Sequence, residues 1–320
     1  MPRTLGAVPL PSDHPALAVV APPRMARLRE LLELGPDDPI EADFTGWSKL
    51  VLLTDRHAVL FPRDHTQVDS LRREADALRA LAPLGLAVVP RVEAEWDDRD
   101  LSAYPVVVLQ RLPGVLLADV VEEIDATTVV ALFGQLGALA AGWHAVDPAE
   151  VPDLPRRAGL DAFASLAHTL ELGPAETQAA GWALERARAL DPVLVHGDLH
   201  EGQVLVAPDP PHTVTGIVDW QTSRIDHPFV EFDLGEWGTA MWRAHRSRFP
   251  ELRRQAWEAY ATARSLPNDL GPVFEWYHAC SHVRRLVGDR AFPVAHAADV
   301  VGTLAEARET VRAALRTLRA

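Results

Sequence analysis

The sequence predicts an α+β fold with two unequal lobes, a smaller one built on an antiparallel sheet and a larger one that is mainly helical. Short apolar, β-branched runs dominate the chain as far as Pro113-Gly114, and amphipathic helical patterns dominate beyond it. The length of 320 residues is sufficient for two lobes with a cleft between them. Pro113-Gly114 is a clear break in the pattern and is therefore the expected hinge.

The smaller lobe is expected to span residues 25–112, after a proline-rich leader at residues 1–24. The prolines and an acidic residue in this leader argue against a signal peptide. The lobe should contain, in order, an amphipathic helix, two strands joined by a tight polar turn, a second helix with apolar residues three and four apart, and a buried strand. These elements are expected at Met25–Leu34, Lys49–Leu53, Ala58–Phe61, Ser70–Leu81 and Tyr104–Leu109.

The larger lobe is expected to span residues 113–320 and to consist mainly of helices. Apolar residues recur with helical spacing in five segments. These are Thr127–His144, Ala175–Leu190, Glu251–Ala263, Val273–Val287 and His296–Leu318. Two short strand patterns, Gln203–Val206 and Val214–Asp219, interrupt this series.

Composition narrows the possible partners. The formal net charge of −14 argues against nucleic acid, whose phosphates require clustered positive charge. The same charge is compatible with a cationic substrate, although many cytoplasmic proteins are simply acidic. Cys280 is the only cysteine, which excludes an internal disulfide and a cysteine-based zinc site and fits a cytoplasmic protein. No apolar run approaches the roughly 20 residues of a membrane span, so no membrane partner is expected.

The segment that carries chemistry is VLVHGDLHEGQVLVAPDPPHTVTGIVDWQTSRIDHPFVEFDLG, at residues 193–235. Asp198 is expected in a loop, Gln203 follows five residues later, and a hairpin ends at a second carboxylate, Asp219. Phosphoryl transfer requires one carboxylate to accept or orient the hydroxyl proton and another to hold Mg²⁺ against the nucleotide phosphates. The amide oxygen of Gln203 can complete such a site, because Mg²⁺ prefers oxygen ligands.

The same segment resembles a known family. HGDLHEGQVLV is similar to the HGDLHxxN catalytic loop of the aminoglycoside phosphotransferase and choline kinase families, and IVDW resembles their metal-binding strand end. The resemblance implies a protein-kinase-like fold, with Asp198 as catalytic base, Gln203 and Asp219 as Mg²⁺ ligands, and His196 bracing the loop. His200 is included among the catalytic-loop residues, with packing or capping as its alternative role.

The resemblance extends over roughly residues 44–235. RIDHPFVEF is similar to a family motif in which Glu231 stands where an aspartate braces the catalytic loop from below. GALAAGWHAVDP resembles the family helix that ends in Leu-His, and His144 is expected there as a buried, hydrogen-bonded core residue. LRREADALRAL resembles the helix whose glutamate, here Glu74, pairs with the phosphate-binding cation. YPVVVLQRLPG resembles the strand and hinge that bind adenine through backbone groups, which implies Gln110, Arg111 and Leu112.

Two positions depart from the family pattern. Gln203 replaces the usual asparagine and carries the same amide on a longer stem. Phe61 stands where the pattern VL(K/R) has its phosphate-binding cation. Arg63 is the preferred substitute, paired with Glu74, because it lies two residues further along an extended strand and so shares the face of Phe61. The sequence FPR at this point also resembles phosphotransferases that act on the peptide antibiotics viomycin and capreomycin.

Lys49 is the other candidate for the phosphate-binding cation, and it is the only lysine in the chain. It follows Gly46 and Ser48, which are expected in the nucleotide-binding loop. Some protein kinases place their lysine on this neighbouring strand. The choice between Arg63 and Lys49 depends on which side chain reaches the nucleotide phosphates, with Glu74 turned towards it.

The resemblance implies a Mg²⁺-dependent enzyme that transfers phosphate from ATP or GTP to a hydroxyl of a small molecule. Antibiotics of the aminoglycoside, macrolide, peptide or nucleoside type are the expected acceptors, which would confer antibiotic resistance. Acidic and tryptophan residues in the C-terminal region would suit a cationic or sugar-bearing substrate, with core packing as the alternative for the tryptophans. They are Glu236, Trp237, Trp242, Glu275 and Trp276.

Two other functions remain open. The departures at Phe61 and Gln203 are compatible with a pseudokinase or nucleotide-binding regulatory protein without turnover. The presence of both Asp198 and Asp219 favours an active enzyme. A housekeeping metabolite kinase is the third possibility, because the acceptor itself cannot be deduced from these motifs.

Overall fold

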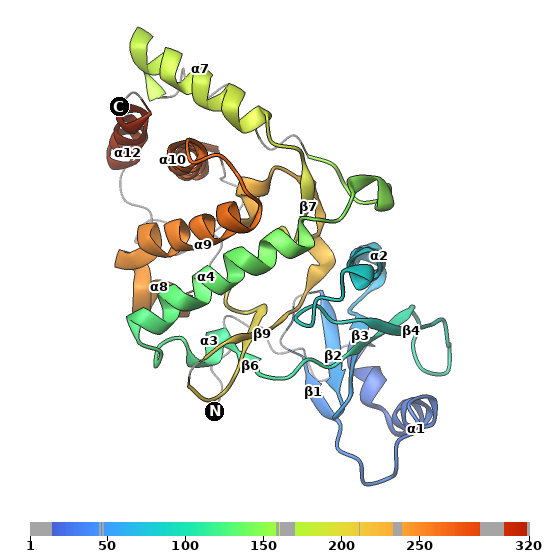
Figure 1. Cartoon of the computed structure of the whole chain (residues 1–320). Helices are drawn as coiled ribbons and strands as arrows, with labels where there is room; N and C mark the ends of the chain where they lie inside the picture. The colour runs from blue at the N-terminus through green and yellow to red at the C-terminus, as the bar shows by residue number, and fades with distance from the viewer. Residues whose placement is uncertain are drawn as a thin grey trace.

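A computed structural model of the chain describes residues 15–44, 46, 48–157, 160, 170–210, 212–232, 239–288 and 304–318. It confirms the expected α+β class, with an antiparallel sheet in the N-terminal part and a mainly helical C-terminal part. In Figure 1 the sheet, coloured blue to teal, lies at the lower right, and the helical part extends to the left and above it.

The N-terminal sheet has five strands in the order β1-β2-β3-β5-β4, and all neighbouring strands are antiparallel. The strands are β1 (Glu41–Asp43), β2 (Lys49–Leu53), β3 (His57–Pro62), β4 (Val92–Trp96) and β5 (Val106–Gln110). Helix α1 (Pro22–Leu31) precedes the sheet, and α2 (Val68–Leu81) connects β3 to β4.

Both faces of this sheet are covered, and the two-residue period of the strands separates their side chains into two clusters. In β3, Val59 and Phe61 belong to one cluster together with Leu28 of α1. Leu60, between them, belongs to the main core together with Leu78 of α2. Strand β5 is apolar without alternation because it contributes to both clusters, as its continuous apolar run predicted.

The C-terminal part combines helices with two small antiparallel sheets, β6-β8-β9 and β7-β10. Its strands are β6 (Val115–Leu116), β7 (Val193–Val195), β8 (Val204–Val206), β9 (Val214–Ile217) and β10 (Arg224–Asp226). Its helices are α3 (Leu117–Val120), α4 (Ala126–Trp143), α7 (Pro174–Arg188), α8 (Thr239–His245), α9 (Phe249–Ala263), α10 (Leu270–Gly288) and α12 (Leu304–Thr317). Helix α4 packs along α9, and α10 packs against α7 and α12 (Figure 1).

Several strands were not predicted from the sequence. Four of them, β1, β6, β7 and β10, have only two or three residues, too few for a period to be recognised. The fifth, β4, alternates apolar and charged residues as VEAEW, which is the expected signal of a half-exposed strand. The helix expected at His296–Leu318 is present as α12 from Leu304, and residues 296–303 lie outside the described residues.

Helix α4 is more apolar than the sequence analysis allowed. Among the described residues it is long and apolar enough, by length and composition, to cross a membrane. The core helix of a globular protein passes the same test, and α4 carries a buried stripe along its length. Its buried residues are Val129, Leu132, Phe133, Leu136, Gly137, Ala140, Ala141 and Trp143. Packing against α9 therefore accounts for its composition.

Close approach of α4 and α9 depends on Gly137. A Cβ atom added at this position would lie 1.9 Å from the carbonyl oxygen of Ala256. Backbone atoms of α9 cannot move aside without displacing the helix, so we expect Gly137→Ala to lower the free energy of unfolding by about 3 kcal/mol. Urea unfolding followed by circular dichroism measures this loss.

Gly181 in α7 provides a matched control, because a Cβ atom added there would meet nothing within 4 Å. Gly181→Ala should leave stability unchanged or raise it by up to about 1 kcal/mol, since alanine is the better helix former. Equal effects of the two substitutions would contradict the assignment of Gly137 as a crossing point.

His227, just after β10, is a buried imidazole held in its neutral form. Its Nε2 is 3.0 Å from the carbonyl oxygen of Ala187, and its Nδ1 accepts the backbone N–H of Phe229 at 3.2 Å. An acceptor at Nδ1 requires that nitrogen to be unprotonated. Burial lowers the pKa of His227 to about 4, although the carbonyl of Ala187 and the charge of Asp226 each raise it in part.

We expect His227 to lower the free energy of unfolding as the pH falls below neutrality. Its pKa is lower in the folded than in the unfolded state, so its contribution is complete above about pH 6.5 and is lost as pH falls towards 4. Between pH 7 and pH 5 the loss should be about 2 kcal/mol. Urea unfolding at the two pH values should show a smaller difference in His227→Asn than in the parent. His65→Asn, at an exposed position, should keep the parent's difference.

Candidate active site

The loop that carries Asp198 begins directly after β7 and turns at Gly197. The backbone of Gly197 has φ +86°, a conformation that residues with a side chain rarely adopt. A Cβ atom there would also lie 2.6 Å from the carbonyl oxygen of Thr222. Glycine in the HGD sequence therefore allows the loop to lie against the segment leading into β10, with Asp198 half-buried beyond the turn.

Glu231 supports this loop from below, in the contact that the sequence predicted. Its Oε2 accepts the backbone N–H of His196 at 2.8 Å and lies 3.2 Å from both Trp143 Nε1 and His144 Nε2. His144 Nδ1 is 3.0 Å from the Tyr260 hydroxyl. Burial lowers the pKa of His144, so the ring is neutral, and it is the buried core histidine that was expected. Burial alone would raise the pKa of Glu231, but the hydrogen bond from His144 helps to keep it below its ordinary value.

His196 connects the catalytic loop to the second carboxylate. Its Nε2 is 2.9 Å from the carbonyl oxygen of Val218, and its ring packs edge-on against Trp220 at 4.7 Å between centroids. Asp219 lies between these two residues with φ 69° and ψ 55°, a left-handed conformation that is unusual for a residue other than glycine. Such strained residues cluster at functional sites, because the surrounding contacts must hold them in place.

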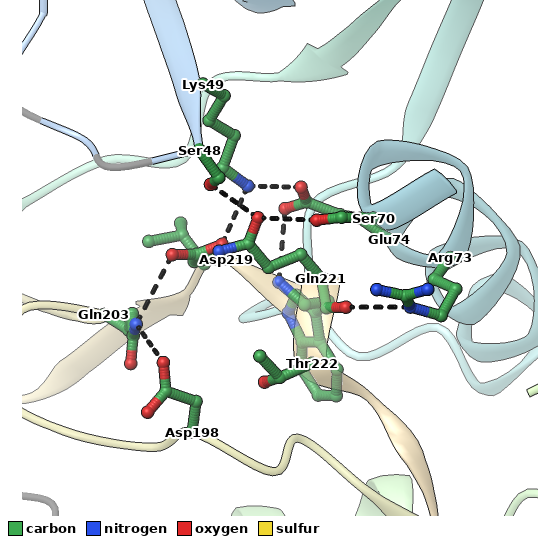
Figure 2. Close-up of polar contacts among 12 residues, drawn as sticks. Ser48, Lys49, Ser70, Arg73, Glu74, Asp198, Gln203, Asp219, Gln221 and Thr222 are labelled. Carbon is green, nitrogen blue, oxygen red and sulfur yellow. Dashed lines mark hydrogen bonds and ion pairs between the residues drawn. The ribbon is translucent and has the colours of Figure 1, made fainter. Parts of the chain in front are cut away.

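The β8–β9 hairpin brings the three predicted catalytic and metal residues together. Gln203 Nε2 lies 3.3 Å from Asp198 Oδ2 and 3.4 Å from Asp219 Oδ2, so the amide stands between the two carboxylates (Figure 2). The other amide atom, Gln203 Oε1, is buried and has no hydrogen-bond partner among the described residues. A half-turn of the amide would exchange the two atoms and direct the oxygen towards the carboxylates.

This group of atoms fits a hard cation such as Mg²⁺. Its donors are two carboxylates and an amide oxygen, the ligand types that Mg²⁺ prefers. No group of three or more histidine, cysteine, aspartate or glutamate side chains within the described ranges could hold a metal ion. The Gln203 amide oxygen, which has no hydrogen-bond partner within the described ranges, would add a third oxygen ligand to the two carboxylates.

Lys49 lies beside this group with its ammonium between the buried carboxylate of Glu74 and the partly buried carboxylate of Asp219. Its Nζ pairs with Glu74 Oε2 and lies 2.8 Å from Asp219 Oδ1 (Figure 2). Burial disfavours the charged form, but Asp219 and Glu74 together raise the pKa of Lys49 above its ordinary value. Burial raises the pKa of Glu74, whereas Lys49 keeps the pKa of Asp219 low despite burial. A fixed positive charge thus stands next to the candidate metal ligands.

The expected pairing of Arg63 with Glu74 is wrong. Arg63 does share the face of Phe61, but that face points towards the α1 cluster and away from α2. Its Nη2 donates to the carbonyl oxygen of Phe44 instead. The residue of β3 that faces α2 is Leu60, and Lys49 reaches Glu74 from the neighbouring strand β2.

The other predicted nucleotide-site residues lie in the loop before β2 and at or just after the end of β5. Gly46 and Ser48 lie in the loop between β1 and β2, and Ser48 Oγ donates to Gln221 Oε1 at 2.7 Å. The backbone N–H groups of Gln110 and Arg111 donate to the carbonyl oxygens of Arg91 and Arg56. These two amides are therefore occupied within the lobe and cannot contact a nucleobase in this arrangement. Leu112 is buried.

His200 caps a turn of its own loop, and Trp276 packs in the core, which are the alternative roles given for them above. His200 Nδ1 accepts the backbone N–H of Gly202 at 3.0 Å, a contact that stabilises the loop's own turn. Trp276 is only 3% exposed and belongs to the core, and Glu275 pairs with Arg253 at 3.3 Å. Residues 233–238, which include Glu236 and Trp237, lie outside the described residues, as does the side chain of Trp242.

Sequence analysis missed the polar face of α2. Ser70, Arg73 and Glu74 have helical spacing and all contact the short turn Trp220–Thr222 that follows Asp219. Glu74 Oε1 accepts the backbone N–H of Trp220 at 3.2 Å, and Arg73 Nε donates to the carbonyl oxygen of Gln221 at 3.4 Å. A signal was available, since this spacing places the three residues on one face beside the predicted glutamate.

Comparison with known proteins agrees with this geometry. Residues 39–273 match the phosphotransferase enzyme family, known as APH. The chain belongs to this family. Viomycin phosphotransferase from Streptomyces vinaceus is 31% identical over 193 residues, which cover 56% of this chain and 66%, slightly less than two thirds, of that protein. The family that the motifs resembled is thus confirmed.

Solved structures of APH phosphotransferases share the fold. The GDP complex of aminoglycoside 2'-phosphotransferase-IIIa superposes with a TM-score of 0.54 at 16% identity, covering 92% of this chain and 99% of that one. Macrolide 2'-phosphotransferase from Brachybacterium faecium superposes with a TM-score of 0.51 at 20% identity, covering 91% and 97%. At these identities the similarity supports the kinase-like fold and does not identify an acceptor.

Proposed function

We propose that this protein transfers the terminal phosphate of ATP or GTP to a hydroxyl of a small-molecule antibiotic in a Mg²⁺-dependent reaction. The observation that carries the proposal is the grouping of Asp198, Gln203 and Asp219 beside the Lys49–Glu74 ion pair. Phosphoryl transfer needs little covalent chemistry from the protein, so catalysis depends on positioning and on charges placed around the phosphates. This arrangement supplies a base, oxygen ligands and a fixed cation.

In this proposal each side chain has a separate task. Asp198 is half-buried in the loop after β7, and it accepts or orients the proton of the attacking hydroxyl. Gln203 and Asp219 would hold Mg²⁺, which neutralises phosphate charge when bound. The ammonium of Lys49 binds phosphate oxygens and is itself oriented by Glu74. His196 and Glu231 hold the loop so that these groups keep their relative positions.

Viomycin is the first acceptor to test. The relative from Streptomyces vinaceus is named for its action on viomycin, and it shares 31% identity with this chain over the aligned part. The acidic net charge of −14 is compatible with a cationic antibiotic. Aminoglycosides and macrolides follow, because solved structures with the same fold bear those names.

The test is an acceptor screen with purified protein, Mg²⁺ and either ATP or GTP, followed by mass spectrometry of the acceptor. We expect a phosphorylated product with at least one antibiotic class and none when Mg²⁺ is chelated. Asp198→Asn should form product at least about a hundredfold more slowly under the same conditions. Tight nucleotide binding without a product from any antibiotic or common metabolite alcohol would instead support a nucleotide-binding protein without turnover.

A further inference from the structure

Gln221 is a polar residue for which the proposed chemistry provides no role. It lies two residues after Asp219, and its side-chain oxygen accepts two hydrogen bonds (Figure 2). Ser48 Oγ donates to Gln221 Oε1 at 2.7 Å, and Ser70 Oγ donates to the same oxygen at 3.0 Å. One amide oxygen therefore joins the loop between β1 and β2, the turn after the metal-binding carboxylate, and α2.

The backbone around Gln221 is fixed independently of its side chain. Arg73 Nε donates to the carbonyl oxygen of Gln221, and the N–H of Trp220 donates to Glu74 Oε1. The turn is thus docked on α2 by its main chain. The side chain of Gln221 is therefore not required to hold the turn on α2. It points back towards Ser48 and accepts the hydrogen bond of that hydroxyl.

The position of Ser48 affects the candidate phosphate and metal site. It directly precedes Lys49, whose ammonium lies 2.8 Å from Asp219 Oδ1. The backbone N–H of Arg63 donates to the carbonyl oxygen of Ser48 at 3.0 Å, so this end of the loop is also tied to the end of β3. Fixing the Ser48 side chain to the turn after Asp219 therefore sets the position of the loop relative to the candidate phosphate and metal site.

We propose that Gln221 is a positioning residue that latches the loop between β1 and β2 onto the turn after Asp219 before nucleotide binds. The proposal rests on the function proposed above for this site. Ordering the loop in the free protein reduces the conformational entropy that nucleotide binding must overcome, and this reduction tightens binding. Gln221 acts through Ser48 and touches no reacting group in this arrangement.

The test compares Gln221→Met, which preserves side-chain length but lacks the acceptor oxygen, with the parent. Loss of one or two hydrogen bonds should raise the nucleotide dissociation constant about threefold to tenfold. The turnover number at saturating nucleotide should change less than the Michaelis constant for nucleotide. Backbone amides of Gly46, Ser48 and Lys49 should exchange with deuterium faster in the nucleotide-free variant than in the parent.

A double-mutant cycle separates the latch from direct contact of Ser48 with nucleotide. Ser48→Ala should weaken nucleotide binding in the same direction as Gln221→Met, and the double variant should be no worse than Gln221→Met, because both substitutions remove the same Ser48–Gln221 hydrogen bond. Ser48→Thr retains the hydroxyl, so its nucleotide dissociation constant should be close to that of the parent. Gln67→Ala, at a glutamine whose side chain bonds only to Thr66 among the described residues, is the matched control.

Additive effects of Ser48→Ala and Gln221→Met would overturn the proposal, because they would mean that the two side chains act separately. Unchanged exchange of the loop amides in Gln221→Met would overturn it as well. Neither measurement requires an acceptor, and the exchange measurement requires no nucleotide. Failure to find a phosphorylated product would therefore count against the proposed function alone and leave the latch to be judged by the cycle and the exchange rates.

Discussion

Replacement of Asp198 by asparagine should reduce turnover by a factor on the order of a hundred to ten thousand, the range over which general base catalysis contributes. The Asn side chain has nearly the same shape and can still accept the hydrogen bond that Gln203 Nε2 makes to Asp198 Oδ2 at 3.3 Å. It cannot take a proton from the attacking hydroxyl. Nucleotide affinity and unfolding free energy should therefore stay close to those of the parent.

Steady-state kinetics with the acceptor found in the screen, together with calorimetric nucleotide binding, checks this result. Asp209→Asn is the matched control, since Asp209 is exposed in the turn between β8 and β9. It should behave as the parent in both measurements. Turnover of Asp198→Asn within threefold of the parent would remove Asp198 from the mechanism, whatever the control shows.

The proximity of the three candidate residues Asp198, Gln203 and Asp219 could be predicted from the sequence because they lie close together in the chain. Only one loop and one hairpin separate Asp198, Gln203 and Asp219 in the chain. A hairpin returns the chain to its starting point, so the three side chains were expected to lie close together. The contact of Glu231 with the backbone of His196 could be predicted for the same reason. The larger elements were predictable from period alone, since long amphipathic helices such as α2 and α9 expose a repeated apolar face.

The cation that pairs with Glu74 could not be predicted in this way. The choice depended on which face of the sheet meets α2, and that is decided by packing across β2, β3 and α1. Strand period correctly placed Arg63 on the face of Phe61, but it could not say that α1 covers that face. Gln221 was missed because its partners, Ser48 and Ser70, come from segments more than a hundred residues away.

The electrostatic arrangement around Lys49 follows from the same packing. Two carboxylates, the buried Glu74 and the partly buried Asp219, lie on either side of the Lys49 ammonium, and such a pair is unfavourable unless a positive charge lies between them. Protein kinases place this lysine on their third strand. Here Leu60 occupies the α2-facing side of β3, and the only lysine of the chain supplies the charge from β2.

Lys49→Met should therefore have two separable effects. Activity should fall by a factor on the order of a hundred to a thousand, as expected when a preorganised charge next to the transferred phosphate is lost. The unfolding free energy should also fall by about 3 kcal/mol, because the buried carboxylate of Glu74 is left without its partner next to the partly buried Asp219. Steady-state kinetics and urea unfolding measure the two effects independently.

The double variant Lys49→Met/Glu74→Gln distinguishes catalysis from folding. Removing the Glu74 charge relieves the buried repulsion, so much of the lost stability should return while activity stays low. Arg63→Ala is the control for loss of a nearby cation, and it should retain most activity because the Arg63 guanidinium contacts the backbone of Phe44 on the other side of the sheet. An Arg63→Ala variant as inactive as Lys49→Met would mean that the nucleotide-bound protein rearranges this strand. Recovery of activity in the double variant would show that the charge of Lys49 serves the fold and not the phosphates.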